Sequence, residues 1–119
     1  MSGRLTDKVV FITGAASGIG SATADAVRAE GGVVAAADLT APEGLGNRDM
    51  ALTLDVTDSA AMADAVASIV KHYGKLDGLV TCAGISVAGT VTHFSLEEWD
   101  RALAVNLTGT MLAARAVIP

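Results

Sequence analysis

The chain has 119 residues, of which 51% are hydrophobic, and it carries a formal net charge of -5. This length allows one domain with a buried core, but it is short for a complete dinucleotide-dependent enzyme. The acidic balance and the lack of a Lys/Arg cluster argue against nucleic acid or an anionic membrane as a partner, because both require dense positive charge.

The composition also bears on location. No apolar run approaches the roughly 18 residues of a transmembrane helix. The polar start of the chain, residues 1–8, lacks the hydrophobic segment of a secretory signal. A single cysteine, Cys82, excludes an intrachain disulfide. We therefore expect a cytoplasmic protein whose ligand is a small metabolite.

The first predicted unit is a strand over residues 8–12, a glycine-rich turn and a helix over 18–30. The turn, Thr13–Gly20, has the spacing of a phosphate-binding loop. Its first glycine permits a tight bend, the middle one lets the backbone approach a pyrophosphate, and the last lets the helix pack closely. Because the helix N-terminus also offers free N–H groups and positive dipole, the unit predicts a nucleotide site.

The next apolar run, residues 33–37, ends at Asp38, eighteen residues after Gly20. This is near the spacing of about 20 at which an acidic side chain binds the adenosine ribose hydroxyls. The alternative is an aspartate that merely starts a turn. In the ligand-binding role, the Asp38 carboxylate would repel a ribose 2′-phosphate, and neither Ala16 nor Leu39 supplies a compensating cation. The pattern therefore favours NAD over NADP.

The middle of the chain continues the alternation of strands and helices. A loop over residues 39–49 leads to a strand over 50–54, and apolar residues at helical spacing follow from Asp58 or Ser59 up to Gly74. A fourth strand is expected over 76–81. This order predicts a Rossmann-type α/β fold with a doubly wound parallel sheet.

The last predicted helix begins at a capping box, Ser95–Glu98, with Phe94 and Trp99 in the hydrophobic-staple positions. A local kink is expected near Asn106, because Asn, Thr and Gly weaken the helix there. An apolar stripe at four-residue spacing predicts a core or oligomer contact and consists of Trp99, Leu103, Leu107 and Met111.

Four motifs together resemble the N-terminal part of the short-chain dehydrogenase/reductase family, and the resemblance covers the whole chain. Thr13–Gly20 matches the family's Thr-Gly-x-x-x-Gly-x-Gly turn, and Asp55-Val56 matches its adenine-contacting pair. Thr81–Gly84 corresponds to its Asn-Asn-Ala-Gly turn, with both asparagines replaced, and Val105-Asn106 carries its catalytic asparagine.

The resemblance implies a role for each matching position. The pyrophosphate would lie at Ser17, Gly18 and Ile19, the adenine at Asp55-Val56, and the cofactor ribose near Ala83-Gly84. The full cofactor site predicted from the glycine turn, the spacing and the resemblance comprises Gly14, Ser17, Gly18, Ile19, Gly20, Asp38, Asp55, Val56, Cys82, Ala83 and Gly84. Cys82 is expected to be a small buried residue without a redox role, since no basic side chain adjoins it.

Of the family's Ser, Tyr, Lys and Asn catalytic groups, only the asparagine has a counterpart, Asn106. The single tyrosine, Tyr73, is followed four residues on by Asp77 instead of lysine, so core packing is its expected role. The resemblance therefore implies the cofactor half of an NAD-dependent dehydrogenase acting on an alcohol or ketone, truncated and inactive alone. His72 and His93 lack further ligands nearby, so no metal is expected.

Other functions stay open at this point. One alternative is a non-catalytic nucleotide-binding or interaction module, because the family's Ser, Tyr and Lys have no counterparts. Another is a truncated chain without independent activity, because the fourth strand lacks its next neighbour. A methyltransferase is a more distant alternative. The sequence does not identify the substrate, and a homo-oligomer is possible.

Overall fold

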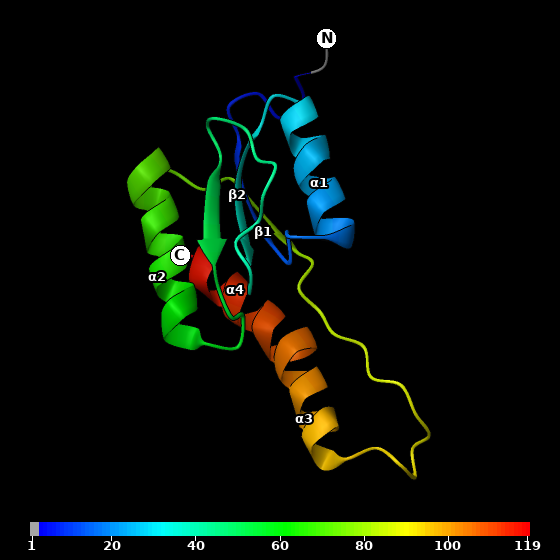
Figure 1. Cartoon of the computed structure of the whole chain (residues 1–119). Coiled ribbons are helices and arrows are strands. Elements are labelled where there is room, and N and C mark those ends of the chain that lie inside the picture. The colour runs from blue at the N-terminus through cyan, green and yellow to red at the C-terminus, as the bar shows by residue number, and fades with distance from the viewer. Residues whose placement is uncertain (1–2) are drawn as a thin grey trace.

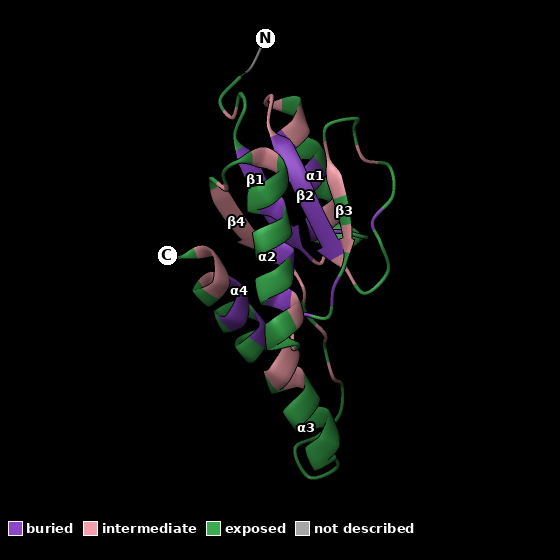
Figure 2. Cartoon of the chain, turned by 90° about the vertical axis from the view of Figure 1, so that its left-hand side faces the viewer, coloured by how far each residue is buried: buried purple, intermediate pink, exposed green. Residues whose placement is uncertain are grey.

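The computed structural model describes residues 3–119 (Figure 1) and contains one parallel sheet of four strands in the order β3-β2-β1-β4, all of which are labelled in Figure 2. Helix α1 connects β1 to β2, and α2 connects β3 to β4, so the strand order reverses beside β1. The predicted α/β fold and strand–helix alternation are confirmed. In chain order the elements are β1 (Val9–Thr13), α1 (Gly18–Ala29), β2 (Val33–Asp38), β3 (Met50–Thr53), α2 (Ser59–Tyr73), β4 (Gly78–Thr81), α3 (Leu96–Leu103), the π-helical turn η1 (Ala104–Thr108) and α4 (Gly109–Val117).

The two central strands are apolar along their whole length because both faces of the sheet are covered. Successive side chains of a strand point to opposite faces. Phe11 of β1 packs on the side of α2 and α4, whereas its neighbour Ile12 packs on the side of α1. The figures show the same layers, with α1 on one face and α2 and α4 on the other.

Helix α2 has the ends that its sequence predicts. The carboxylate of Asp58 accepts a hydrogen bond from the backbone N–H of Ala61, and Gly74 ends the helix in the left-handed conformation. At the start of α3, the hydroxyl of Ser95 accepts a hydrogen bond from the N–H of Glu98 at 3.1 Å. The expected N-caps of both helices are confirmed.

The C-terminal helical segment differs most from the expectation of a core helix. Helix α3 extends away from the sheet and contains no buried residue (Figure 2). The predicted irregularity at Asn106 is present as the π-helical turn η1. All four residues of the expected stripe are exposed, so within this chain the stripe is not a core contact; it consists of Trp99, Leu103, Leu107 and Met111. Within residues 3–119, none of the helices is both long and apolar enough to span a membrane.

Candidate nucleotide-binding site

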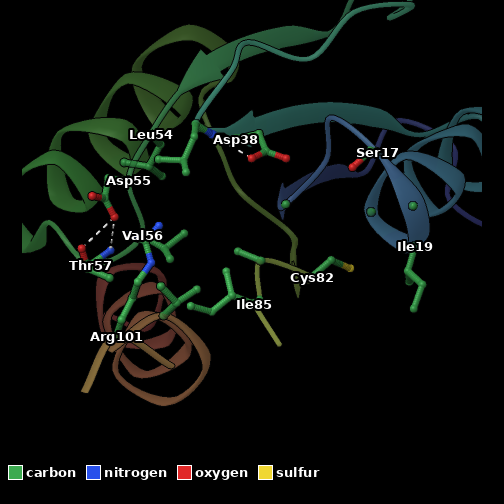
Figure 3. Close-up of a pocket in the computed structure, with 17 residues that line it drawn as sticks. Ser17, Ile19, Asp38, Leu54, Asp55, Val56, Thr57, Cys82, Ile85 and Arg101 are labelled. Carbon is green, nitrogen blue, oxygen red and sulfur yellow. Dashed lines mark hydrogen bonds between the residues drawn. The ribbon is translucent and has the colours of Figure 1, made fainter. Parts of the chain in front are cut away.

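A cleft of about 450 Å³ opens at the carboxyl ends of the strands (Figure 3). In an open α/β sheet this end, at the point where strand order reverses, is where ligands bind. All of the residues predicted for the cofactor site line this one cleft: Gly14, Ser17, Gly18, Ile19, Gly20, Asp38, Asp55, Val56, Cys82, Ala83 and Gly84. The structure thus brings together side chains and backbone from four separate segments.

The glycine turn has the conformation that its sequence requires. Gly14 has a φ of +67°, and a Cβ atom at this position would lie 2.4 Å from the backbone nitrogen of Ala83. A Cβ atom on Gly20 would lie 2.1 Å from the carbonyl oxygen of Gly14. Both positions therefore need glycine because other backbone atoms approach closely. The turn after β1 packs against the turn after β4, and together they form one wall of the cleft.

The N-terminus of α1 points its unsatisfied donors at the cleft. Ser17 stands at the N-cap, but its side chain makes no capping hydrogen bond, and the first turn of the helix contains no acidic side chain. Gly18 has a φ of +57°, and apart from its chain neighbours and the backbone of its own helix, no atom of residues 3–119 lies within 4 Å of where its Cβ would be. The open space, the free hydroxyl and the first N–H groups of a 12-residue helix suit a phosphate.

Asp38 ends β2 directly beside the glycine turn. One carboxylate oxygen accepts a hydrogen bond from the N–H of Ala16 at 3.0 Å, and the other accepts from the N–H of Leu39 at 2.7 Å. The backbone N–H of Ala15 in turn donates to the carbonyl of Ala37 at 3.0 Å. These contacts fix the carboxylate toward the cleft. Each carboxylate oxygen retains a further lone pair with which it can accept from a ligand hydroxyl.

Asp55 and Val56 form the far wall of the cleft, after β3. One oxygen of Asp55 accepts from both the hydroxyl and the N–H of Thr57, at 2.7 and 2.9 Å. These two hydrogen bonds, with a smaller contribution from the charge of Arg101, hold the pKa of Asp55 below its ordinary value. Asp55 is therefore a charged acceptor among the residues that line the cleft. Val56 is fixed by Gly109 of α4, where a Cβ atom would lie 2.7 Å from the valine side chain.

The turn after β4 is held by backbone contacts. The N–H of Cys82 donates to the carbonyl of Thr13 at 3.1 Å, and the N–H of Ala83 donates to the hydroxyl of Thr13 at 3.4 Å. These bonds need neither of the asparagines that the family's turn has at positions 81 and 82. The sequence predicts that Cys82 is a small buried residue; its side chain packs against the core but is half-buried and contributes to the cleft wall.

Asn106 lies on η1 beside the cleft, but it is not among the lining residues. Its side-chain oxygen accepts from the N–H of Ile85, and its side-chain nitrogen donates to the carbonyl of the same residue, both at 2.8 Å. This pair ties the loop after β4 to the helical segment. The catalytic role of Asn106 stays a prediction; the structure shows a positioning contact.

Six further residues line the cleft: Leu39, Leu54, Thr57, Ile85, Arg101 and Val105. Thr57 has a local signal, since an aspartate commonly bonds the backbone two residues on. Arg101 and Val105 are one helical turn apart, so they share a face of the helix. Nothing in the sequence indicates that this face turns toward the end of β3, because α3 is placed by long-range contacts.

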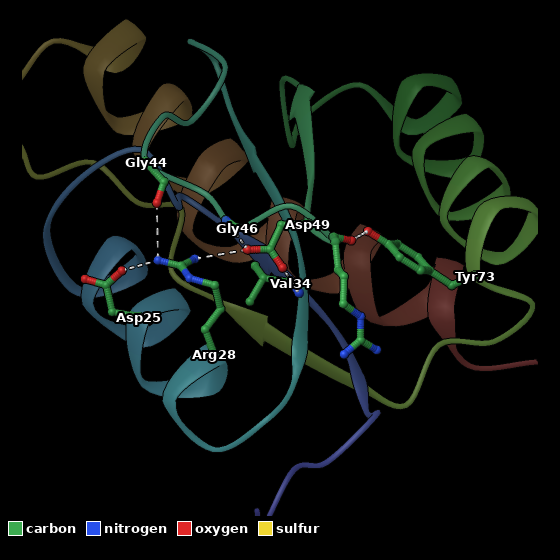
Figure 4. A network of polar contacts seen from close by, with 8 residues as sticks. Asp25, Arg28, Val34, Gly44, Gly46, Asp49 and Tyr73 are labelled. Carbon is green, nitrogen blue, oxygen red and sulfur yellow. Dashed lines mark hydrogen bonds and ion pairs between the residues drawn. The ribbon is translucent and has the colours of Figure 1, made fainter.

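The opposite end of the sheet carries structural polar contacts (Figure 4). Arg28 of α1 donates to Asp49 at 3.3 Å and contacts Asp25, while Asp49 also accepts from the N–H of Val34 at 2.9 Å. The hydroxyl of Tyr73 donates to the carbonyl of Arg48 at 2.6 Å. Tyr73 packs against the core, as expected, and burial raises the pKa of its hydroxyl. It therefore takes no part in the cleft.

Comparison with known proteins agrees with this arrangement. The profile of the family described as short chain dehydrogenase matches residues 8–119. The chain is 40% identical to the D-threitol dehydrogenase of Mycolicibacterium smegmatis over 123 aligned residues, which cover 96% of this chain and 47% of that protein. It is 37% identical to the trans-4-hydroxycyclohexanecarboxylate dehydrogenase of Sinomonas cyclohexanicum, covering 100% of this chain and 52% of that protein.

Among solved structures, the ligand-free aldohexose dehydrogenase of Thermoplasma acidophilum superposes with a TM-score of 0.91 at 36% sequence identity. The match covers 100% of this chain and 46% of that structure. The chain therefore spans about half the length of the relatives that it matches.

Proposed function

The chain belongs to the short-chain dehydrogenase family, and from this premise we propose that it provides the NAD(H)-binding half of an oxidoreductase that transfers hydride to or from an alcohol or ketone carbon. The observation that carries the proposal is the position of Asp38. Its carboxylate is fixed by two backbone N–H groups in the same cleft as the glycine turn and the N-terminus of α1.

The cleft residues fit a dinucleotide by their chemistry. Ser17 and the first N–H groups of α1 would hold the diphosphate. The free lone pairs of the Asp38 carboxylate would accept from the hydroxyls of the adenosine ribose. Leu39 and Val56 also line the cleft, and their apolar surface suits an aromatic base. The nicotinamide of a bound cofactor would supply the hydride chemistry, and these residues would hold the rest of the dinucleotide in place.

A direct test is a titration with NADH, followed by nucleotide fluorescence, together with alkylation of Cys82. Because Cys82 is the only cysteine and lines the cleft, saturating NAD should slow its reaction with N-ethylmaleimide several-fold, whereas inorganic phosphate should not. The Cys82→Ser variant controls for labelling elsewhere. If neither NADH nor NADPH gives a saturable signal at millimolar concentration, the proposed cofactor site is wrong for this chain.

The preference for NAD over NADP rests on the charge of Asp38. A ribose 2′-phosphate beside this carboxylate would be repelled, so NADH should bind at least about tenfold more tightly than NADPH, equivalent to about 1.4 kcal/mol. The double variant Asp38→Ser, Leu39→Arg should reverse the order, since it removes the repulsion and adds a cation. Equal dissociation constants for the two cofactors in the unmodified chain would contradict the assignment.

Turnover by this chain alone is not expected. General acid–base catalysis contributes roughly 10²–10⁴-fold to a rate, and the one tyrosine lies at the opposite end of the sheet with its hydroxyl bonded to Arg48. Asn106 would contribute by holding the loop at Ile85. The whole protein, with the other half of its relatives' length, is the form in which hydride transfer should be sought.

A second candidate is a nucleotide-binding module without catalysis, which the distant position of Tyr73 favours for this chain. The two are distinguished by adding NAD with D-threitol or trans-4-hydroxycyclohexanecarboxylate, the compounds named for the relatives. Measurable NADH formation would eliminate the non-catalytic function. Saturable cofactor binding without NADH formation, by both this chain and the whole protein, would support it.

A further inference from the structure

Within residues 3–119, Arg101 is the arginine whose side chain forms neither a hydrogen bond nor a close ion pair, although its charge acts on Asp55 at longer range. Arg4 pairs with Glu30, Arg28 with Asp25 and Asp49, Arg48 with Asp7, and Arg115 bonds the hydroxyl of Ser59. Arg101 makes no comparable hydrogen bond or ion pair in that part of the chain, yet its side chain lines the cleft. A guanidinium whose N–H donors form no hydrogen bond in the fold, and which lines a cleft, is a candidate for contact with a ligand.

The position of Arg101 within the cleft limits what it can contact. It extends from α3 toward the segment of Asp55 and Val56, on the side of the cleft away from Ser17 and Ile19 (Figure 3). A diphosphate held at the N-terminus of α1 would lie at the other end. The guanidinium therefore faces the region that an aromatic base would occupy if its ribose lay at Asp38.

The surroundings of Arg101 suit a flat ring. Val105 lies one helical turn after it and also lines the cleft, and Leu39 and Val56 supply apolar lining from the segments that follow β2 and β3. Asp55 places a charged acceptor at the same end, where it can receive a hydrogen bond from an exocyclic amine. A planar guanidinium over the face of such a ring adds cation–π attraction and stacking.

We propose that Arg101 contacts the face of the adenine base and raises the affinity of the cleft for adenine nucleotides. The inference rests on the proposed function, because it assumes a dinucleotide with its ribose at Asp38. It assigns to α3 a part in binding, although this helix buries no residue in the fold. Arg101 would therefore contribute to recognition of the adenine base of the ligand and not to binding of its phosphates.

The test compares ligands with and without adenine. Arg101→Gln should weaken the binding of NADH about three- to tenfold, as expected for one cation–π contact, and should leave reduced nicotinamide mononucleotide unaffected. Arg101→Lys should fall between the two because it retains the charge without the planar group. Arg115→Gln is the matched control, since Arg115 bonds Ser59 and does not line the cleft.

The possible failures are distinguishable. If the unmodified chain binds no NADH, the proposed function fails first. If it binds NADH but Arg101→Gln binds it equally well, the adenine contact is wrong while the cofactor site stands. An equal loss for NADH and the mononucleotide, or a loss confined to NADPH, would assign Arg101 to a phosphate and overturn the inference. Circular dichroism of each variant checks that its fold is retained.

Discussion

The two ends of the chain differ in how fully the fold surrounds them. Strands β1 and β2 are buried almost throughout, whereas β4 is half-exposed and α3 buries no residue. The cleft is built where the two regions meet, with the glycine turn and Asp38 from the first and the turn after β4 and Arg101 from the second. The cleft is therefore formed even though the part of its wall contributed by the second region is exposed to solvent.

The largest difference between the regions should appear in core truncations. Phe11→Ala removes a fully buried ring and should lower the free energy of unfolding by about 3–5 kcal/mol. Leu107→Ala, at a residue that is 66% exposed, should change it by less than about 0.5 kcal/mol. Urea denaturation at low protein concentration measures both. A large loss for Leu107→Ala would show that a partner surface covers η1 in solution.

The second comparison concerns two glycines with similar backbone conformations. Gly14 and Gly44 have φ values of +67° and +72°, but only at Gly14 would an added Cβ meet other atoms. Gly14→Ala should cost about 1–3 kcal/mol more than Gly44→Ala because of this overlap with Ala83. It should also weaken NADH binding more than tenfold, equivalent to about 1.4 kcal/mol. Thermal melts and NADH titrations of both variants test the close approach of the two turns.

The sequence predicts the buried N-terminal region, with β1, β2 and the glycine turn, better than the exposed C-terminal region, with β4 and α3, for a physical reason. The glycine turn, the end of β2 at Asp38 and the caps of α2 each depend on a few neighbouring residues, so local rules identify them. The direction of α3 and the entry of Arg101 into the cleft depend on long-range contacts, such as that between Asn106 of η1 and the loop at Ile85. Local periodicity correctly gives the stripe containing Trp99, but it does not tell whether a core or solvent faces it.

The exposed stripe allows a third prediction, about self-association. Contiguous apolar surface on a helix favours contact with another copy of the chain. Leu103→Glu combined with Leu107→Glu should reduce the apparent mass of the chain in light scattering toward that of a monomer. Its thermal stability should change little, since both side chains are exposed. The control is Leu112→Glu at a buried position of α4, which should unfold the chain.

If the double variant melts at a much lower temperature than the unmodified chain, the stripe stabilises the fold itself through contacts between copies. If the unmodified chain is already monomeric, the stripe does not drive association. Both results concern only how the C-terminal helices associate, and neither bears on the glycine turn.

The smallest and most local effect is expected at Asp77, which joins the two regions. One of its carboxylate oxygens accepts from the N–H of Val9 at 2.8 Å and pairs with Lys75 at 3.1 Å. The bond from Val9 is the main reason that the pKa of Asp77 lies below its ordinary value of 3.8. Because the folded pKa is the lower one, the stabilisation is present above pH 3.8 and is lost as the pH falls through the folded value.

Asp77→Asn should therefore loosen β4 at neutral pH, while at lower pH the variant and the unmodified chain should become alike. Hydrogen exchange measures this strand by strand: the amides of β4, which within residues 3–119 pairs with β1 alone, should exchange faster in the variant, and those of β2 should not change. Asp64→Asn, on α2, is a control for the loss of one negative charge. Faster exchange throughout the sheet would show that the two regions unfold as one unit, because the contact at Val9 would then stabilise both.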